Sequence, residues 1–334
     1  MKKISKILVL FSMVCLLSGC NKTENLEIYA TSYPIEYLVS SLYKEHSTVT
    51  SIYPDGTNVN EYTLTDKQKD TYSKGDIFVY NGTTNEKQIA KDLVNTNKKL
   101  KVMDAALSLK YTNRTEELWL SPSNYLMLAT NIRDNLIEQI GTKYINEEIN
   151  NNYKKLEEEL SIMDATIRSI ATSASKKGRN TIVASSNVFK FLENYGFQVI
   201  SLEDYQANTT GLNSLKNNFK NGTYKYLLVE SDEKTNDAIN EITSNGGKSI
   251  VVNMMNTLSE NDRKNNETYF TSLKLNSGLL FKISLICSIC FSRSLIFTAN
   301  FFFVCSAFCC FSDSISTPIK DSIARLLFFS DCLK

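Results

Sequence analysis

Residues 145–174 read INEEINNNYKKLEEELSIMDATIRSIATSA and decide the fold of this chain. Their apolar side chains recur at alternating steps of three and four residues, the spacing of one buried helix face. These side chains are Ile145, Ile149, Tyr153, Leu156, Leu160, Met163, Ile167, Ile170 and Ala174. At about 1.5 Å per residue the predicted helix is about 45 Å long. Its charged face is predicted to be solvated. A coiled coil is the alternative, but no second long helix is predicted as its partner.

On both sides of this helix, short β-rich runs alternate with helix-sized segments. The predicted strands are 26–31, 48–52, 76–80, 100–104, 181–184, 198–201, 226–230 and 249–252. The predicted helices between them are 35–44, 65–73, 85–94, 188–195, 212–219 and 234–244. Such alternation is typical of βαβ units and parallel sheets. The sequence therefore predicts an α/β fold, in which two similar lobes with parallel sheets are joined by one long backbone helix.

Charge and histidine content exclude several classes of function. The formal net charge is +1, which gives no reason to expect a nucleic-acid partner. The single histidine, His46, argues against a Ser-His-Asp triad and against a zinc site built on imidazoles. His46 is expected on the surface, in the turn between the predicted helix 35–44 and the predicted strand 48–52. Because no pair of catalytic groups can be named, we do not expect an enzyme.

The first twenty residues contain the segments of an export signal in their usual order. Three lysines precede the apolar stretch Ile7–Leu17, which is too short to span a bilayer. The stretch closes with Leu17-Ser18-Gly19-Cys20, which resembles a bacterial lipobox. An ordinary signal peptide that contains a cysteine is the alternative. The sequence predicts lipidation of Cys20 and an anchor at the extracytoplasmic face of the cell membrane.

The C-terminal segment differs in composition from the rest. Residues 277–334 hold six of the eight cysteines, and Ser294–Phe311 is an uncharged run that reaches the lower length of a membrane span. We interpret 277–334 as frame-shifted or read-through sequence, with a membrane span as the alternative. The predicted organisation is a signal peptide at 1–20, an N-terminal lobe at 21–140, the long helix at 141–176, a C-terminal lobe at 177–276 and the aberrant tail.

Loops at the carboxyl ends of the predicted strands mark a cleft between the lobes. Parallel sheets bind ligands at that edge, and two facing lobes bring their loops together. Four such loops offer Asn60, Glu117, Ser186 and Asn253. Trp119 is expected to brace a loop beside the cleft. Asp204–Tyr205 and Glu230–Asp232 also end strands; they are interpreted as solvated loops, with contact to the cleft as the alternative.

Five motifs in order resemble one family, the zinc/manganese ABC-transporter solute-binding lipoproteins of cluster A-I. They are Thr31-Ser32-Tyr33-Pro34, Pro54-Asp55-Gly56 with Asn60-Glu61-Tyr62, Gly75–Gly82, Glu117–Pro122, and Ser185–Phe191 followed by Tyr195-Gly196. The long connecting helix is also a trait of that family. The resemblance covers about residues 30–276.

The resemblance implies a metal site, but this chain departs from its pattern. The family holds zinc or manganese, its transported ligand, by His, His, His or Glu, and Asp, at the positions of Asn60, Glu117, Ser186 and Asn253. None of the four keeps the family's residue. Neutral oxygen donors are poor replacements for imidazole at zinc. Three interpretations stay open: cleft-lining residues only, a site for another small polar ligand, or metal capture with help from Glu203, Asp204 or another nearby carboxylate.

These observations predict a lipid-anchored extracytoplasmic solute-binding component of an ABC transporter of the zinc/manganese type, with a degenerate metal site. The expected partners are an ABC permease and a divalent metal ion or another small polar ligand, and the chain is expected to be a monomer. The alternative is an adhesin-like surface lipoprotein that keeps the fold without binding metal. The resemblance further implies that ligand capture is a small closure of loops, because a rigid long helix limits movement of the lobes.

Overall fold

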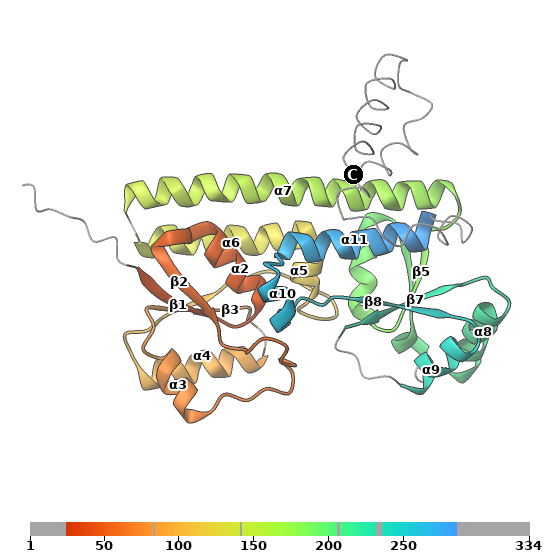
Figure 1. Ribbon diagram of the computed structural model, residues 1–334, viewed down its shortest axis with the longest axis horizontal. Helices are drawn as coiled ribbons and strands as arrows, with labels where there is room; N and C mark the ends of the chain where they lie inside the picture. Colours follow the sequence, from red (N-terminus) through yellow and green to blue (C-terminus); the bar gives the residue numbers. More distant parts are fainter. Residues whose placement is uncertain (1–24, 83, 141, 206–207, 232–235, 286–334) are drawn as a thin grey trace, which may run out of the picture. The chain divides into compact units, whose positions relative to one another are not determined.

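The computed structural model describes residues 25–285 except 83, 141, 206–207 and 232–235 (Figure 1). The expected signal sequence, the lipidation at Cys20 and the tail beyond 285 lie outside the described residues. The described residues up to Ser284 belong to one compact unit that contains two four-stranded sheets. We call the parts built on these sheets the N-terminal lobe and the C-terminal lobe.

The sheet of the N-terminal lobe has the order β2-β1-β3-β4, with all strands parallel. The strands are β1 (Leu26–Ala30), β2 (Ser47–Ser51), β3 (Ile77–Tyr80) and β4 (Lys101–Asp104). The helices are α2 (Tyr33–Tyr43), the 3₁₀ turn η1 (Lys44–His46), α3 (Asp66–Tyr72) and α4 (Thr84–Thr96). Because every strand runs in the same direction, the loops that follow the strands gather at one edge of the sheet.

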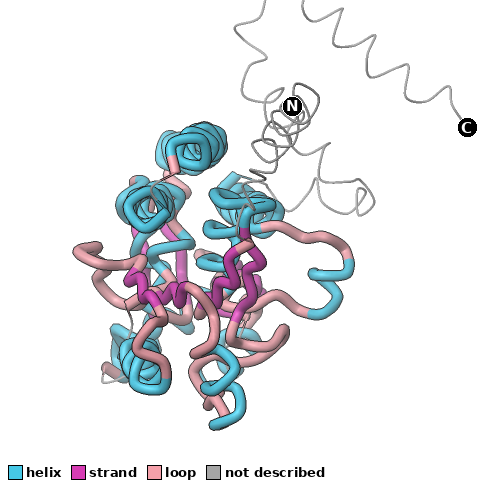
Figure 2. The backbone as a smooth tube through the Cα atoms, turned by 90° about the vertical axis from the view of Figure 1, so that its left-hand side faces the viewer, coloured by secondary structure: helices cyan, strands magenta, loops and turns pink. Residues whose placement is uncertain are grey.

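The C-terminal lobe repeats the same topology with the order β6-β5-β7-β8. Its strands are β5 (Thr181–Ala184), β6 (Gln198–Ser201), β7 (Tyr226–Glu230) and β8 (Lys248–Val252). Its helices are η2 (Asn187–Tyr195), η3 (Leu202–Tyr205), α8 (Thr209–Lys220) and α9 (Asp237–Ser244). Both ends of every predicted strand lie within one residue of the ends of an observed strand. Helices lie on both sides of the strands in the view of Figure 2.

The long helix is α7 (Lys143–Lys176), and it runs past elements of both lobes, as Figure 1 shows. All nine residues of the predicted apolar stripe are buried. The helix contacts α2 of the N-terminal lobe and η2 of the C-terminal lobe. The predicted fold class, two parallel α/β lobes joined by one backbone helix, is therefore confirmed.

A second long helix, α6 (Pro122–Ile140), packs along α7, so the expectation that no such helix is available was wrong. Its buried side chains include Tyr125, Leu128, Ile132 and Leu136, a helical spacing that the sequence already contained. The Thr130 hydroxyl lies 2.8 Å from the Tyr153 hydroxyl of α7. The two helices form a pair along the lobes.

After β8 the chain returns to the N-terminal lobe. The backbone N–H groups of Tyr33 and Gly56 donate to the carbonyls of Asn256 and Leu258, at 3.1 and 2.7 Å. Next comes the short helix α10 (Glu260–Lys264), whose Arg263 forms ion pairs with Glu36 and Asp55. This returning segment ties the two lobes together independently of α7.

The last described helix, α11 (Tyr269–Leu285), crosses the composition boundary at Ser277 without a break. Ser277, Leu280 and Ser284 are all buried. The first residues of the expected tail therefore belong to this helix and pack into the fold. Within the described part of the chain, no helix is both long enough and apolar enough to cross a membrane. The alternative span at Ser294–Phe311 lies outside that part.

His46 is buried, so its expected surface position was wrong. The reason is non-local: helix α7 passes the turn that carries His46. The imidazole Nε2 lies 2.6 Å from a carboxylate oxygen of Glu148 on α7, and the ring lies beside Tyr43. His46 thus joins the N-terminal lobe to the backbone helix.

We expect His46→Ala to lower the midpoint of thermal unfolding by a few degrees, since it empties a buried position and removes a hydrogen-bonded partner of Glu148. The matched control is Glu45→Ala at the exposed neighbouring position, which should leave the midpoint unchanged. Melting followed by circular dichroism measures both. Equal midpoints for the two variants would contradict a structural role of His46.

Candidate functional site

The candidate site lies where the carboxyl end of the C-terminal sheet meets the segment that follows β4. Hydrogen bonds across the sheet fix the strand ends side by side: Ser185 N–H donates to Leu228 O at 2.8 Å, and Ser231 N–H donates to Val252 O at 2.9 Å. Glu230, the last residue of β7, therefore lies between the loops that carry Ser186 and Asn253. The segment after β4 supplies Arg114, Glu116 and Glu117.

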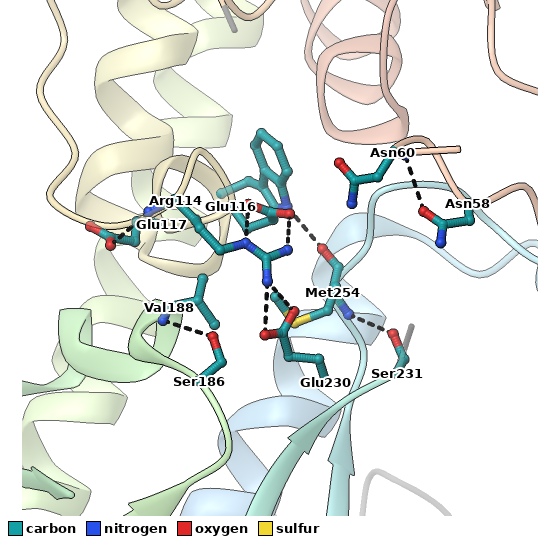
Figure 3. Close-up of polar contacts among 11 residues, drawn as sticks. Asn58, Asn60, Arg114, Glu116, Glu117, Ser186, Val188, Glu230, Ser231 and Met254 are labelled. Atoms are coloured by element: carbon teal, nitrogen blue, oxygen red, sulfur yellow. Dashed lines mark hydrogen bonds and ion pairs between the residues drawn. The ribbon is translucent and has the colours of Figure 1, made fainter. Parts of the chain in front are cut away.

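Ser186 and Asn253 both hold their own loops. Ser186 is the N-cap of η2, and its hydroxyl oxygen accepts a hydrogen bond from Val188 N–H at 3.1 Å. The side-chain oxygen of Asn253 accepts from Met255 N–H at 2.8 Å. Asn60 is exposed, and its backbone N–H donates to the side chain of Asn58 (Figure 3). Neutral oxygens engaged in this way are weak candidates for metal ligands.

Glu117 is the single carboxylate among the four predicted positions, and it is buried within its own loop. Its carboxylate accepts from the backbone N–H groups of Thr112, Asn113 and Arg114 at 3.1, 2.8 and 3.3 Å. The Asn113 side-chain amide adds a fourth bond at 2.9 Å. Figure 3 shows the Glu117 carboxylate directed away from the Arg114 guanidinium. Glu117 therefore shapes the turn before α5 (Glu117–Leu120).

A network of ion pairs links the two lobes: Arg114, whose side chain is 35% exposed, contacts two buried glutamates. Nη1 of Arg114 lies 2.8 and 2.6 Å from the two carboxylate oxygens of Glu230. On its other side the guanidinium contacts Glu116, with Nη2 at 2.5 Å and Nε at 3.3 Å from the carboxylate oxygens (Figure 3). The side chains of Glu116 and Glu230 are only 9% and 5% exposed. The interpretation of Glu230 as part of a solvated loop was therefore wrong.

The Arg114 guanidinium is a permanent cation in this site. Burial acts to lower its pKa, but the hydrogen bonds and charges of Glu116 and Glu230 outweigh burial and raise the pKa above its usual value. Glu116 receives two contacts from the planar fork of Nε and Nη2, the geometry in which arginine binds carboxylates most strongly, whereas both oxygens of Glu230 contact the single nitrogen Nη1. The positive charge is therefore fixed between the two lobes.

A further buried carboxyl group, Glu86 on α4, is close enough to Glu116 to be affected by its charge. One of its oxygens accepts from Asn81 N–H at 2.9 Å. Burial is the main reason that the pKa of Glu86 is raised to about 7, and the nearby charges of Asp104 and Glu116 raise it further. The Asn81 N–H and the Thr31 hydroxyl act in the opposite direction. Glu86 can therefore change its charge near neutral pH.

Trp119 braces the site, as the sequence predicted. It is buried, and its indole N–H donates to Met254 O at 2.8 Å, which joins α5 to the segment after β8. The Trp119 carbonyl in turn accepts from the Tyr269 hydroxyl at 2.6 Å. Through its side chain and its backbone carbonyl, Trp119 thus connects three segments that are distant in sequence.

The two carboxylates considered as auxiliary metal ligands also make local contacts. Glu203 accepts from Asn187 N–H at 2.7 Å, and Asp204 pairs with Lys190 at 2.8 Å. Among the described residues no group of three or more histidine, cysteine, aspartate and glutamate side chains could hold a metal ion. The side chains present therefore do not fit the zinc ligand set that the resemblance implies.

Sequence reasoning missed Arg114 and Glu116 and underrated Glu230. The signal that could have found the first two is the charged run Arg114-Thr115-Glu116-Glu117, directly before the Trp119 motif. Glu230 ends a strand that is otherwise apolar, at the edge where parallel sheets place their functional groups. Nothing in the sequence pairs Arg114 with Glu230, because 116 positions separate them.

Comparison with known proteins gives a consistent picture. The family model described as "Zinc-uptake complex component A periplasmic" matches residues 28–280. A Thermotoga maritima protein named "Putative metal-binding protein" is 25% identical over 213 residues, which cover 63% of this chain and 75% of that protein.

Solved structures share the fold at low sequence identity. The Zn(II)-bound ZnuA-like domain of Streptococcus pneumoniae AdcA has a TM-score of 0.64 at 23% identity, with 78% of this chain and 99% of that chain covered. The metal-dependent lipoprotein YcdH of Bacillus subtilis has a TM-score of 0.66 at 19% identity, with coverage of 78% and 100%. A mutant laminin-binding adhesin of Streptococcus agalactiae has a TM-score of 0.64 at 17% identity and the same coverage.

Proposed function

The chain belongs to the family of periplasmic A components of zinc-uptake complexes, and from this premise we propose that it is a lipid-anchored, extracytoplasmic solute-binding component of an ABC transporter that does not capture zinc with the family's ligand set. The family match over residues 28–280 supports the transport role and the absence of enzymatic activity. The anchor at Cys20 is supported by residues 1–20, in which lysines, an apolar stretch and a lipobox-like sequence follow one another. An ABC permease is the proposed partner.

One observation supports the proposal that the chain does not capture zinc with the family's ligand set. At the four family ligand positions, the side chains of Glu117, Ser186 and Asn253 accept hydrogen bonds from their own loops, and Asn60 is exposed. Ligation by Glu117 would break its contacts to the backbone N–H groups of the turn before α5, and the other three positions offer only neutral oxygens. The cargo of this cleft is therefore proposed to be a small polar ligand rather than a tightly held transition metal.

We expect the mature chain, stripped with a chelator, to show no tight 1:1 binding of Zn²⁺ or Mn²⁺ by calorimetry. Neutral and locally bonded oxygens give zinc too little stabilisation to compensate for the loss of its hydration shell. Glu117→Gln is the matched variant, because it keeps an acceptor oxygen but removes the single carboxylate of the set. Tight binding by the wild type that is lost in Glu117→Gln would contradict the proposal.

The adhesin-like alternative has one observation in its favour: the lobes are joined by internal ion pairs that need no ligand. The two functions differ in the partner at the cell surface. Cross-linking on intact cells should recover a membrane-embedded permease if the chain is a transport component. Recovery of an extracellular protein without a permease would favour the adhesin-like function.

A further inference from the structure

We propose that Arg114 is the built-in cation of this cleft: its guanidinium takes the place of a captured metal ion, excludes divalent metals and holds the two lobes together without a ligand. This inference takes one element from the proposed function, namely that the transported ligand binds where the loops of the two lobes meet. It assigns a specificity-determining role to Arg114 and a lobe-tying role to Glu116 and Glu230.

The position of the network is the first argument. Glu230 ends β7, the strand between β5 and β8, so it lies between the loops of Ser186 and Asn253. Arg114 and Glu116 stand next to Glu117, a third family ligand position. The guanidinium therefore lies where loops from both lobes converge, as Figure 3 shows for the labelled side chains.

The charge of the site is the second argument. Glu116 and Glu230 are buried, and a buried carboxylate needs a partner of opposite charge or it becomes costly. Arg114 supplies that partner through hydrogen bonds to both of them. A divalent cation attracted to these carboxylates would have to displace a covalently tethered guanidinium, which is present at a very high effective concentration. Metal exclusion follows from this competition.

The connection between lobes is the third argument. Glu116 comes from the segment after β4, whereas Glu230 comes from the C-terminal sheet, so the guanidinium bridges two parts of the fold. Arginine makes such planar two-oxygen contacts more specifically than lysine. The lobes are therefore expected to stay together in the absence of any bound ion.

The test compares cation-dependent stabilisation of the full mature chain and its Arg114→Gln variant. Melting midpoints are measured with a chelator and with about 1 mM Mn²⁺, an ion that oxygen ligands suit. The wild type should show no shift. Arg114→Gln should melt at a lower temperature with chelator and regain several degrees with Mn²⁺, because the ion then replaces the lost positive charge beside Glu116 and Glu230. By calorimetry the variant should bind Mn²⁺ at least about tenfold more tightly than the wild type.

Three further variants make the result specific. Arg168→Gln removes an arginine that pairs with Asp164 at an exposed position, and it should not create any Mn²⁺ response. Arg114→Lys keeps the charge and should remain insensitive to Mn²⁺. The double variant Arg114→Gln with Glu230→Gln removes one of the two carboxylates and should lose the response of the single variant.

Two outcomes would overturn the inference. The first is a wild type that binds Mn²⁺ as tightly as Arg114→Gln, since the guanidinium would then exclude nothing. The second is an Arg114→Gln variant that shows no Mn²⁺ response, or that fails to fold even with Mn²⁺ present. Neither outcome bears on whether the chain reaches a permease, which the cross-linking experiment decides, so the proposed transport role and this inference fail separately.

Discussion

Replacing Trp119 with alanine is expected to lower the free energy of unfolding by about 4 kcal/mol, within the range for removing a buried tryptophan. Trp119 is 2% exposed, so loss of its indole leaves a large cavity in the core. The substitution also leaves the Met254 carbonyl without the hydrogen bond from the indole N–H. Because this bond joins α5 to the segment after β8, one of the connections between these segments is lost together with the packing.

Trp119→Phe separates the two causes. Phenylalanine fills most of the volume but cannot donate to Met254, so it should cost clearly less than alanine. Urea unfolding followed by circular dichroism gives both values, since removal of the chain's only tryptophan excludes intrinsic tryptophan fluorescence. A loss below about 1 kcal/mol for Trp119→Ala would show that the site does not depend on this brace.

Stability is expected to fall as the pH rises towards neutrality, and Glu86 is expected to be a main cause. Its pKa is raised by burial from 4.5 to about 7, so the folded state favours the protonated form. The contribution of a group with a raised folded pKa is complete below its unfolded value and is lost as the pH rises through the folded value. The difference between the folded and unfolded pKa values of Glu86 corresponds to a loss of about 3 kcal/mol in the free energy of unfolding between about pH 4.5 and pH 7.

Glu86→Gln should remove this part of the pH dependence. The amide keeps an acceptor oxygen for Asn81 N–H and cannot ionise, so the variant should gain stability relative to the wild type as the pH rises. The measurement is the difference in unfolding free energy between the two proteins at pH 5 and pH 8, in which the titration of other groups largely cancels. Parallel pH profiles would show that Glu86 does not titrate in this range.

Much of the fold could be predicted because its signals are local. The stripe from Ile145 to Ala174 is a repeat within one helix, and each strand is a short apolar run between turns. The motif order around Trp119 indicated the family, and the family match over residues 28–280 agrees. The apolar spacing of helix α6 is equally local, so this helix too can be predicted without tertiary information.

The candidate site could be predicted only in its location. Strand ends place Asn60, Glu117, Ser186 and Asn253 in loops near the cleft, but the sequence does not say which way a side chain turns. Glu117 points into its own loop because four hydrogen-bond donors are arranged around its carboxylate. Such an arrangement depends on the path of the backbone and not on the type of residue.

The sequence by itself determined the two lobes and the long helix between them, and it led to the prediction that the family's metal ligands are replaced. Only the tertiary structure decided that Arg114 meets Glu230, and that His46 meets Glu148 across 102 positions. The physical reason is that periodicity records which face of an element is buried, whereas an ion pair depends on where two distant segments come together. Burial makes such an ion pair important for stability, because a charged group that is removed from water requires a partner.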